Sequence, residues 1–331
     1  MAVPDVADLV ARARRGEQRA VARLLSLVEN GMDRRPVGRG RDEALRALAA
    51  ALAPHAGRAH VVGLTGPPGV GKSTSTSVLV GALRARGRRV GVLAVDPSSP
   101  FSGGALLGDR IRRGEHATDD GVFIRSMAAR GHLGGLAWAT PQALRVLDAA
   151  GCDVVLVETV GVGQSEMDVV GLADTTVVVL APGAGDEVQA AKAGILEVAD
   201  VFVVNKADRD GADRTVRDLR RMMSLAVATG AWERPVVPTV AVRGEGAHDL
   251  AAALDAHRDW LAASGEGRRR RAARAEAEVE AIVLERVRAR IAGLRGPDGS
   301  TASAERVATG ATDPFRAADE LDRALSQVRD D

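Results

Sequence analysis

The sequence predicts an α/β fold with a mostly parallel central sheet covered by helices, and with helical extensions at both ends of the chain. Three observations support this fold class. Short apolar segments alternate with helical segments, which is typical of parallel sheets covered on both faces. A glycine-rich turn joins the first apolar segment to a helix. The two ends of the chain show helical periodicity alone.

The predicted strands are short runs rich in valine, isoleucine and leucine. They cover 60–64, 89–95, 122–124, 153–157, 175–180, 201–204 and 235–240. Helices are expected between them, at about 72–86, 137–150, 187–198, 212–229 and 246–263. Ligands bind at the carboxyl ends of the strands in such sheets. The residues that follow each strand are therefore the candidate functional residues.

The chain divides into three predicted parts. Residues 1–54 form an N-terminal helical extension, in which Gly31 ends a helix, and 55–265 carry the strands. Residues 266–331 form a C-terminal helical extension, which begins with a solvated linker at Arg268–Arg271. The helices of this extension carry apolar stripes, which must be buried against the main domain or against another copy of the chain.

Composition excludes several classes of protein. The 331 residues carry a net charge of +1, so no surface for nucleic acid is expected. No apolar run approaches the length of a membrane span, and the N-terminus lacks the pattern of a secretory signal. The one cysteine, Cys152, excludes an internal disulfide and a cysteine metal cluster. A reducing, cytoplasmic location is expected.

Lysine is scarce among the basic residues. Only three of the 45 are lysines, at Lys72, Lys192 and Lys206, and the rest are arginines. Codon usage in a GC-rich genome explains the scarcity, but it does not explain where the three lysines lie. A compact ammonium offers a point charge that the planar guanidinium does not. The three positions are therefore candidates for function.

The strongest motif follows the first predicted strand and opens the next helix. It fits the pattern G-x-x-x-x-G-K-[ST], whose glycines let backbone N–H groups surround phosphate oxygens at a helix N-terminus. Lys72 is expected to reach the β- and γ-phosphates, and Ser73 to bind Mg²⁺. The candidate nucleotide-binding residues here are Gly66, Pro67, Pro68, Gly69, Val70, Gly71, Lys72, Ser73 and Thr74.

A second motif, N-K-x-D, follows the fifth strong strand and predicts which base is bound. The carboxylate of Asp208 is placed to accept hydrogen bonds from N1–H and the exocyclic amine of guanine. Adenine offers no such pair of donors, and a buried carboxylate left unpaired is costly. The stem of Lys206 is expected to lie over the base, while Asn205 ties the loop to the phosphate-binding turn. GTP and GDP are therefore the expected ligands.

Metal and switch residues are predicted between these motifs. Asp96 closes the second strand and Glu158 closes the third, and with Ser73 they form a suitable shell for Mg²⁺, which takes few carboxylates. Gly161 is expected to donate its N–H to the γ-phosphate. Gln164 is a candidate catalytic residue that orients the attacking water, although a structural nucleotide binder without this function remains an alternative.

Six segments together give the sequence a resemblance to a known family. They are G-P-P-G-V-G-K-S-T (66–74), V-D-P-S-S-P (95–100), G-G-A-L-L-G-D-R (103–110), G-H-L-G-G (131–135), D-V-V-L-V-E-T-V-G-V-G-Q-S-E (153–166) and V-V-N-K-A-D (203–208). Over about 55–265 the chain resembles the MeaB/ArgK-type GTPases, which include the methylmalonic aciduria type A protein. These are P-loop GTPases of the SIMIBI class.

The resemblance implies a homodimeric chaperone of an adenosylcobalamin-dependent acyl-CoA mutase such as methylmalonyl-CoA mutase. GTP binding and hydrolysis would gate cofactor loading and protect the mutase, and the C-terminal extension would form much of the dimer contact. A mobile element that signals to the mutase corresponds to 185–192. It adds Lys192 to Lys72 and Gln164 as candidate catalytic residues, although an exposed helix position is an alternative for Lys192.

The sequence departs from the family pattern at several positions. Ala105 and Arg110 stand where serine and lysine are usual. The expected S-A-L guanine loop is Val240-Ala241-Val242, which keeps backbone N–H groups for the base but loses a hydroxyl. These departures suggest a divergent paralogue with a different mutase as partner. The mutase-chaperone function has two alternatives. The protein could be a metal-insertion GTPase of a related group, or a transport-linked kinase.

Overall fold

The computed structural model describes residues 5–31, 39–97, 116, 118–129, 139–159, 171–183, 198–224, 232–294 and 302–327. The chain forms two compact units, Met1–Arg268 and Arg269–Asp331. A search of the described ranges finds no helix with the length and apolar character needed to cross a bilayer.

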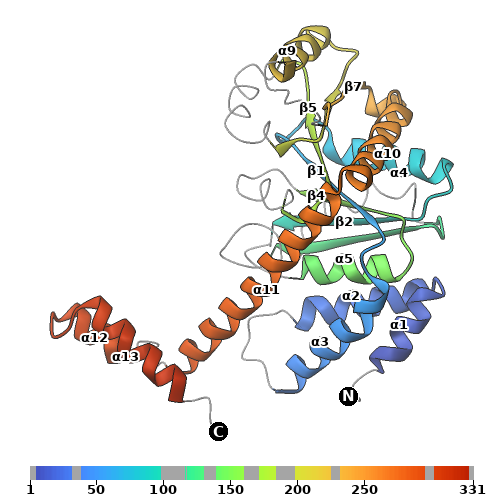
Figure 1. Ribbon diagram of the computed structural model, residues 1–331. Coiled ribbons are helices and arrows are strands. Elements are labelled where there is room, and N and C mark those ends of the chain that lie inside the picture. Colours follow the sequence, from blue (N-terminus) through green and yellow to red (C-terminus); the bar gives the residue numbers. More distant parts are fainter. Residues whose placement is uncertain are drawn as a thin grey trace. The chain divides into compact units, whose positions relative to one another are not determined.

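The first unit is built on a seven-stranded sheet in which every strand pair is parallel (Figure 1). The strands lie in the order β3-β2-β4-β1-β5-β6-β7. Their bounds are β1 His60–Thr65, β2 Val90–Pro97, β3 Val122–Ala129, β4 Val154–Thr159, β5 Thr175–Leu180, β6 Val201–Asn205 and β7 Val236–Thr239. The predicted α/β class is confirmed, and β3 continues well beyond the three residues expected of it.

Alternate residues of the central strands enter two different cores. In β4, Val154 and Leu156 pack on one face of the sheet, while Val155 and Val157 pack on the other. Every residue of β5 and of β6 is buried. Parallel strands covered on both faces have this continuous apolar character, which explains why the valine-rich runs were recognisable in the sequence.

Helices cover both faces of the sheet. On one face, α4 (Lys72–Ala85) and α10 (Ala247–Ser264) share a core with the strands. The other face is covered by α5 (Thr140–Ala149) beneath β2 and β4 and by α9 (Ala212–Ser224) beneath β5 and β6. Both α4 and α5 run between strands, as crossover connections in parallel sheets do.

The N-terminal helices share the core of the sheet. They are α1 (Val6–Arg14), α2 (Gln18–Gly31) and α3 (Arg39–Leu52), and a short 3₁₀ turn η1 (Ala53–His55) leads from them to β1. Their apolar stripes pack against α5, which lies between them and the sheet (Figure 1). An ion pair between the side chains of Glu29 and Arg125 also links α2 to the edge strand β3.

The C-terminal unit is helical, and its start corrects one prediction. It comprises most of α11 (Glu266–Gly293), with α12 (Ala302–Ala308) and α13 (Pro314–Gln327). Arg268–Arg271 was predicted to be a solvated linker, but these residues belong to the first turns of α11. Arginine has a high helix propensity, and its charge is solvated as well on a helix surface as in a loop. The break lies earlier, at Gly265, whose φ of 74° ends α10.

Candidate nucleotide-binding site

Parallel pairing places the candidate residues at one edge of the sheet. Leu64, one residue before the end of β1, lies opposite Glu158 of β4. Asn205, the last residue of β6, lies opposite Thr239, the last residue of β7. Because all the strands point the same way, the turn after β1 shares this edge with both residues. The fold thus brings together motifs that are separated by more than a hundred residues of chain.

The phosphate-binding loop, residues 66–74, depends on glycine geometry. Gly66, Gly69 and Gly71 have φ values of 140°, 76° and 95°, which L-residues rarely adopt. A Cβ at Gly66 would overlap the carbonyl oxygen of Val179, and one at Gly71 would overlap the amide nitrogen of Asn205. These glycines therefore have a steric role as well as a conformational one.

The start of α4 presents amide groups and two functional side chains. Gly71 is the N-cap and has no capping side chain, and the first turn is closed by a hydrogen bond from Ser75 N–H to Gly71 O at 2.9 Å. The Lys72 ammonium, which is buried, donates to the carbonyl oxygens of Gly66 and Pro67 within the loop. A helix N-terminus with a lysine beside it is suited to bind an anion.

Ser73 and Glu158 are in direct contact. The Ser73 hydroxyl donates to the Glu158 carboxylate, which is 2% exposed. Two oxygen ligands predicted for a metal are thus brought together from α4 and β4. The backbone of Asp96 belongs to β2, where the preceding Val95 lies opposite Thr159 of β4. The side chain of Asp96 is outside the described residues.

Asn205 joins three parts of the site. Its amide nitrogen donates to Val70 O at 2.8 Å, and its amide oxygen accepts from Ala241 N–H at 3.0 Å and from the Thr239 hydroxyl at 3.2 Å. The Asn205 side chain is buried. If it were removed, Val70 O, Ala241 N–H and the Thr239 hydroxyl would have little access to water as a replacement partner. Asn205 therefore links the loop at 66–74 to the loop that follows β7. The sequence predicted the link to the loop at 66–74 but not the link to the loop after β7.

The residues after Asn205 form the second half of the site. Lys206 has a φ of 58° and is the one non-glycine residue with positive φ in the described part of the chain. Its ammonium donates to Gly69 O at 2.8 Å, which draws the stem of the side chain across the loop. Asp208 pairs with Arg243, with 2.8 Å between Nη2 and Oδ2.

The loop after β7 contains the predicted residues Val240, Ala241 and Val242. It forms a short 3₁₀ turn, η4 (Ala241–Arg243), and Ala241 is buried where its N–H meets Asn205. Val242 is 82% exposed and thus available to cover an apolar ring. Sequence reasoning missed Arg243 and Thr239. The position of Thr239 at the end of a predicted strand was the available signal, whereas nothing in the sequence placed Arg243 beside Asp208.

Several predicted residues lie outside the described part of the chain. They are Gly161, Gln164, Lys192, Ala105 and Arg110. Their proposed roles stay predictions. The described residues therefore include the loop at 66–74, the Ser73–Glu158 pair that the sequence predicts to bind a metal, and the residues predicted to bind the base.

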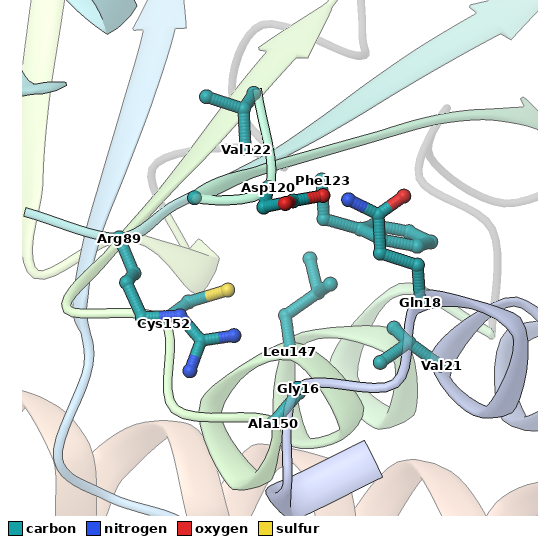
Figure 2. Close-up of a pocket in the computed structure, with 11 residues that line it drawn as sticks. Gly16, Gln18, Val21, Arg89, Asp120, Val122, Phe123, Leu147, Ala150 and Cys152 are labelled. Carbon is teal, nitrogen blue, oxygen red and sulfur yellow. The ribbon is translucent and has the colours of Figure 1, made fainter. Parts of the chain in front are cut away.

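A pocket lies at the opposite edge of the sheet, where the strands begin (Figure 2). It is bounded by the turn between α1 and α2, by the end of α5, and by Arg89 and Val122 at the starts of β2 and β3. Cys152 contributes its thiol to the lining, and burial raises the pKa of this thiol to about 12. A thiol of this kind stays protonated near neutral pH and is a poor nucleophile.

The pKa of Cys152 gives a testable expectation. At pH 8 the folded protein should react with iodoacetamide on the order of 1,000-fold more slowly than the protein in urea, since the thiolate is the reactive form. The raised pKa also means that the thiol's contribution to stability is lost as the pH rises from about 9 toward 12. Equal reaction rates for the folded and the unfolded chain would contradict the buried position of Cys152.

Comparisons with known proteins agree with this architecture. The chain is 46% identical over 315 residues to a putative GTPase of Pyrococcus abyssi, with 94% of each chain covered. It is 37% identical over 266 residues to the GTPase ArgK of Escherichia coli, with 78% of each covered. A solved structure titled as a LAO/AO transport system kinase matches with a TM-score of 0.65 and 26% identity, with 97% of each chain covered.

The family model described as methylmalonyl-CoA mutase-associated GTPase MeaB matches residues 21–295. This range includes most of α2, the whole sheet, both nucleotide motifs and all of α11. The match thus extends beyond the 55–265 region that carried the resemblance in the sequence. The chain belongs to the MeaB family of mutase-associated GTPases.

Proposed function

We propose that this protein binds and hydrolyses GTP and acts as a chaperone that gates cofactor loading into an adenosylcobalamin-dependent acyl-CoA mutase and protects that mutase. The observation that carries the nucleotide part is the hydrogen bonding of Asn205. It holds the phosphate-binding loop and the base-binding loop at a fixed separation. The description of the matching family supports the mutase part.

The phosphates of the nucleotide would bind at the start of α4. Lys72 would leave the carbonyl oxygens of Gly66 and Pro67 and pair with the β- and γ-phosphates. The exchange is favourable because a charged phosphate oxygen is a stronger acceptor for an ammonium than a neutral carbonyl. Backbone N–H groups of 69–74 would complete the binding of the phosphates.

The guanine base would lie between Lys206 and η4. Asp208 would accept from N1–H and the exocyclic amine. Within η4, Ala241 N–H and Arg243 N–H already donate to Asn205 and Val240, so the backbone donor to O6 would be Val242 N–H. The stem of Lys206 would cover one face of the base, and exposed Val242 would bury apolar surface against it. Adenine lacks the N1–H and the exocyclic amine that the Asp208 carboxylate would accept from. The carboxylate would stay unpaired with adenine, which favours GTP over ATP.

The residues present fit Mg²⁺, the metal generally bound with the nucleotide in P-loop GTPases. The oxygen atoms of Ser73 and Glu158 are already in contact, and Asp96 lies one residue before the end of β2, the strand that pairs with that of Glu158. Hard oxygen donors of this kind suit Mg²⁺. The ion would supply positive charge to the phosphates, with Ser73 as a direct ligand and the two carboxylates acting directly or through water.

Hydrolysis and its coupling to the mutase are assigned to residues beyond the described part. Gln164 would orient the attacking water, and Gly161 would contact the γ-phosphate. Lys192 would act in the element that signals to the mutase. We expect Lys192→Ala to leave GTP affinity nearly unchanged and to reduce the stimulation of hydrolysis by the mutase. A normal stimulated rate in this variant would return Lys192 to the role of an exposed helix residue.

A homodimer is part of the proposal. Val279, Val283 and Leu284 of α11 are between 47% and 62% exposed, and Phe315 of α13 is 85% exposed. Apolar side chains gathered on helices in this way favour burial against a partner surface. A second copy of the chain is the partner that the family resemblance implies. The cytoplasm, where the mutase and GTP would both be available, is the proposed location.

The test of the mutase assignment is a capture experiment in extract of the native cell. The protein, loaded with a non-hydrolysable GTP analogue, should retain an acyl-CoA mutase subunit that mass spectrometry identifies. Asp208→Asn protein treated with the same analogue is the matched control, since it should not carry the nucleotide. If no mutase subunit is enriched with the GTP analogue or with GDP, the chaperone assignment is wrong, while GTP binding can still be correct.

A further inference from the structure

The carboxylate proposed to read guanine is held by an arginine of the neighbouring loop. Arg243 Nη2 lies 2.8 Å from Asp208 Oδ2. We propose that Arg243 is a positioning residue that determines base specificity, because its guanidinium holds the Asp208 carboxylate in the orientation that accepts both guanine donors. This inference rests on the proposed function and adds a residue that neither the motif nor the family description assigns.

The backbone of Arg243 is fixed by its own loop. Its N–H donates to Val240 O at 2.8 Å, and Val240 N–H donates to Glu245 O at 3.1 Å, which closes the loop. Gly246 follows with a φ of 80°, and a Cβ there would overlap the carbonyl oxygen of Pro238. The point from which the Arg243 side chain extends is therefore well defined relative to β7.

The side chain of Arg243 is also restrained at its inner nitrogen. Its Nε lies 3.4 Å from Glu245 Oε1. A guanidinium is planar and its donors point in fixed directions, so a contact at Nε limits where Nη2 can lie. Glu245 and the closed loop together direct Nη2 toward Asp208. In η4, Arg243 is also the one residue with a polar side chain, since the other two are alanine and valine.

Arg243 can hold Asp208 without displacing the base. An ionised carboxylate has about four acceptor positions on its two oxygens. Nη2 uses one of them on Oδ2, which leaves Oδ1 and the other position on Oδ2 for the two donors of guanine. The Asp208 side chain is 43% exposed, so it would otherwise be free to change rotamer. Restraining it lowers the entropy lost when guanine binds.

The expected effect is modest because the pair is partly exposed. The Arg243 side chain is 52% exposed, and exposed ion pairs contribute little. We expect Arg243→Ala to weaken GDP binding by about two- to five-fold. Inosine diphosphate lacks the exocyclic amine and uses one donor on Asp208. Its affinity should fall by less, so the preference for GDP over inosine diphosphate should narrow.

The experiment measures GDP and inosine diphosphate affinities by calorimetry in the full-length protein with Mg²⁺. Arg214→Ala is the matched control, because Arg214 forms an exposed pair with Asp218 within α9 and has no contact with Asp208 among the ion pairs of the described residues. Both affinities should be unchanged in this control. Adding Arg243→Ala to Asp208→Asn should change GDP affinity no further, since the carboxylate it positions is already absent.

The outcomes separate this inference from the proposed function. Unchanged or tighter GDP binding in Arg243→Ala, with normal binding in the wild type, would overturn the role of Arg243 alone. An equal loss for both nucleotides, or the same loss in the Asp208→Asn background, would also overturn it, because Arg243 would then act on the phosphates. A wild-type protein that does not prefer GDP to ADP would instead refute the proposed function.

Discussion

Replacing Asp208 by asparagine is expected to lower the affinity for GTP by about 10²- to 10⁴-fold, because the carboxylate is proposed to accept two hydrogen bonds from the base. The amide of asparagine has one acceptor and would bring its own N–H donors toward the donors of guanine. Xanthine carries a carbonyl where guanine has its exocyclic amine. The variant should therefore bind xanthosine triphosphate more tightly than the wild type does.

The matched control for this change is Asp210→Asn. Asp210 lies two residues further along the same loop and is exposed, so its replacement removes the same charge without touching the base. Calorimetry with GTP and xanthosine triphosphate on the three proteins gives the comparison. Unchanged GTP affinity in Asp208→Asn would disprove the assignment of the base contact.

Replacing Lys72 by alanine is expected to reduce GTP hydrolysis by at least about 100-fold, since charge that develops on the phosphates would lose its stabilising cation. Lys72 is 8% exposed, and its ammonium donates to the carbonyl oxygens of Gly66 and Pro67. GDP binding should weaken by less than hydrolysis, because the loss is largest where the transition state gains charge. Phosphate release under steady-state conditions measures the rate.

Arginine is not expected to rescue this position. Its planar fork is larger than an ammonium and cannot take the place of the compact cation that donates to the carbonyl oxygens of Gly66 and Pro67. Lys72→Arg should therefore remain slow, whereas Arg86→Ala, which removes a cation from the far end of α4, should hydrolyse GTP at the wild-type rate. Full activity in Lys72→Arg would show that any cation suffices there.

The fold was predictable from sequence where the signal is local. Strands such as β5 and β6 are buried on both faces, so their valine-rich runs stand out against the helices around them. The packing of the N-terminal helices was not predictable in the same way. An amphipathic stripe shows that a face is buried, but it does not say against what, and Leu24 and Leu25 are buried in a core shared with α5.

The candidate site was predictable to the extent that its residues lie at strand ends. Glycine spacing predicts the loop at 66–74 as the phosphate-binding loop, and Asn205, which the sequence expects to tie the N-K-x-D loop to it, donates to Val70 O of that loop. Ser73 and Glu158 were placed together as metal ligands because both lie at the carboxyl ends of the strands, and the structure brings the two side chains into contact. The pairing of Arg243 with Asp208 depends on how the loop after β7 closes, which is a long-range property that no spacing in the sequence records.

The wrong prediction at Arg268–Arg271 has a similar cause. A cluster of charge after Gly265 and Gly267 is compatible with a linker or with an exposed helix, since both solvate the guanidinium groups. The structure ends α10 at Gly265 and starts α11 directly after it. A helix forms here rather than a linker because the residues from Arg268 onward are mostly arginine, alanine and glutamate, which have high helix propensity.

The most direct test of the central claim, that this site selects guanine nucleotides, is calorimetric titration of the purified protein with GDP and with ADP in the presence of Mg²⁺. The account predicts one GDP bound per chain and an affinity for ADP that is lower by at least about 100-fold. ADP binding as tight as GDP binding, or no binding of either nucleotide, would contradict it.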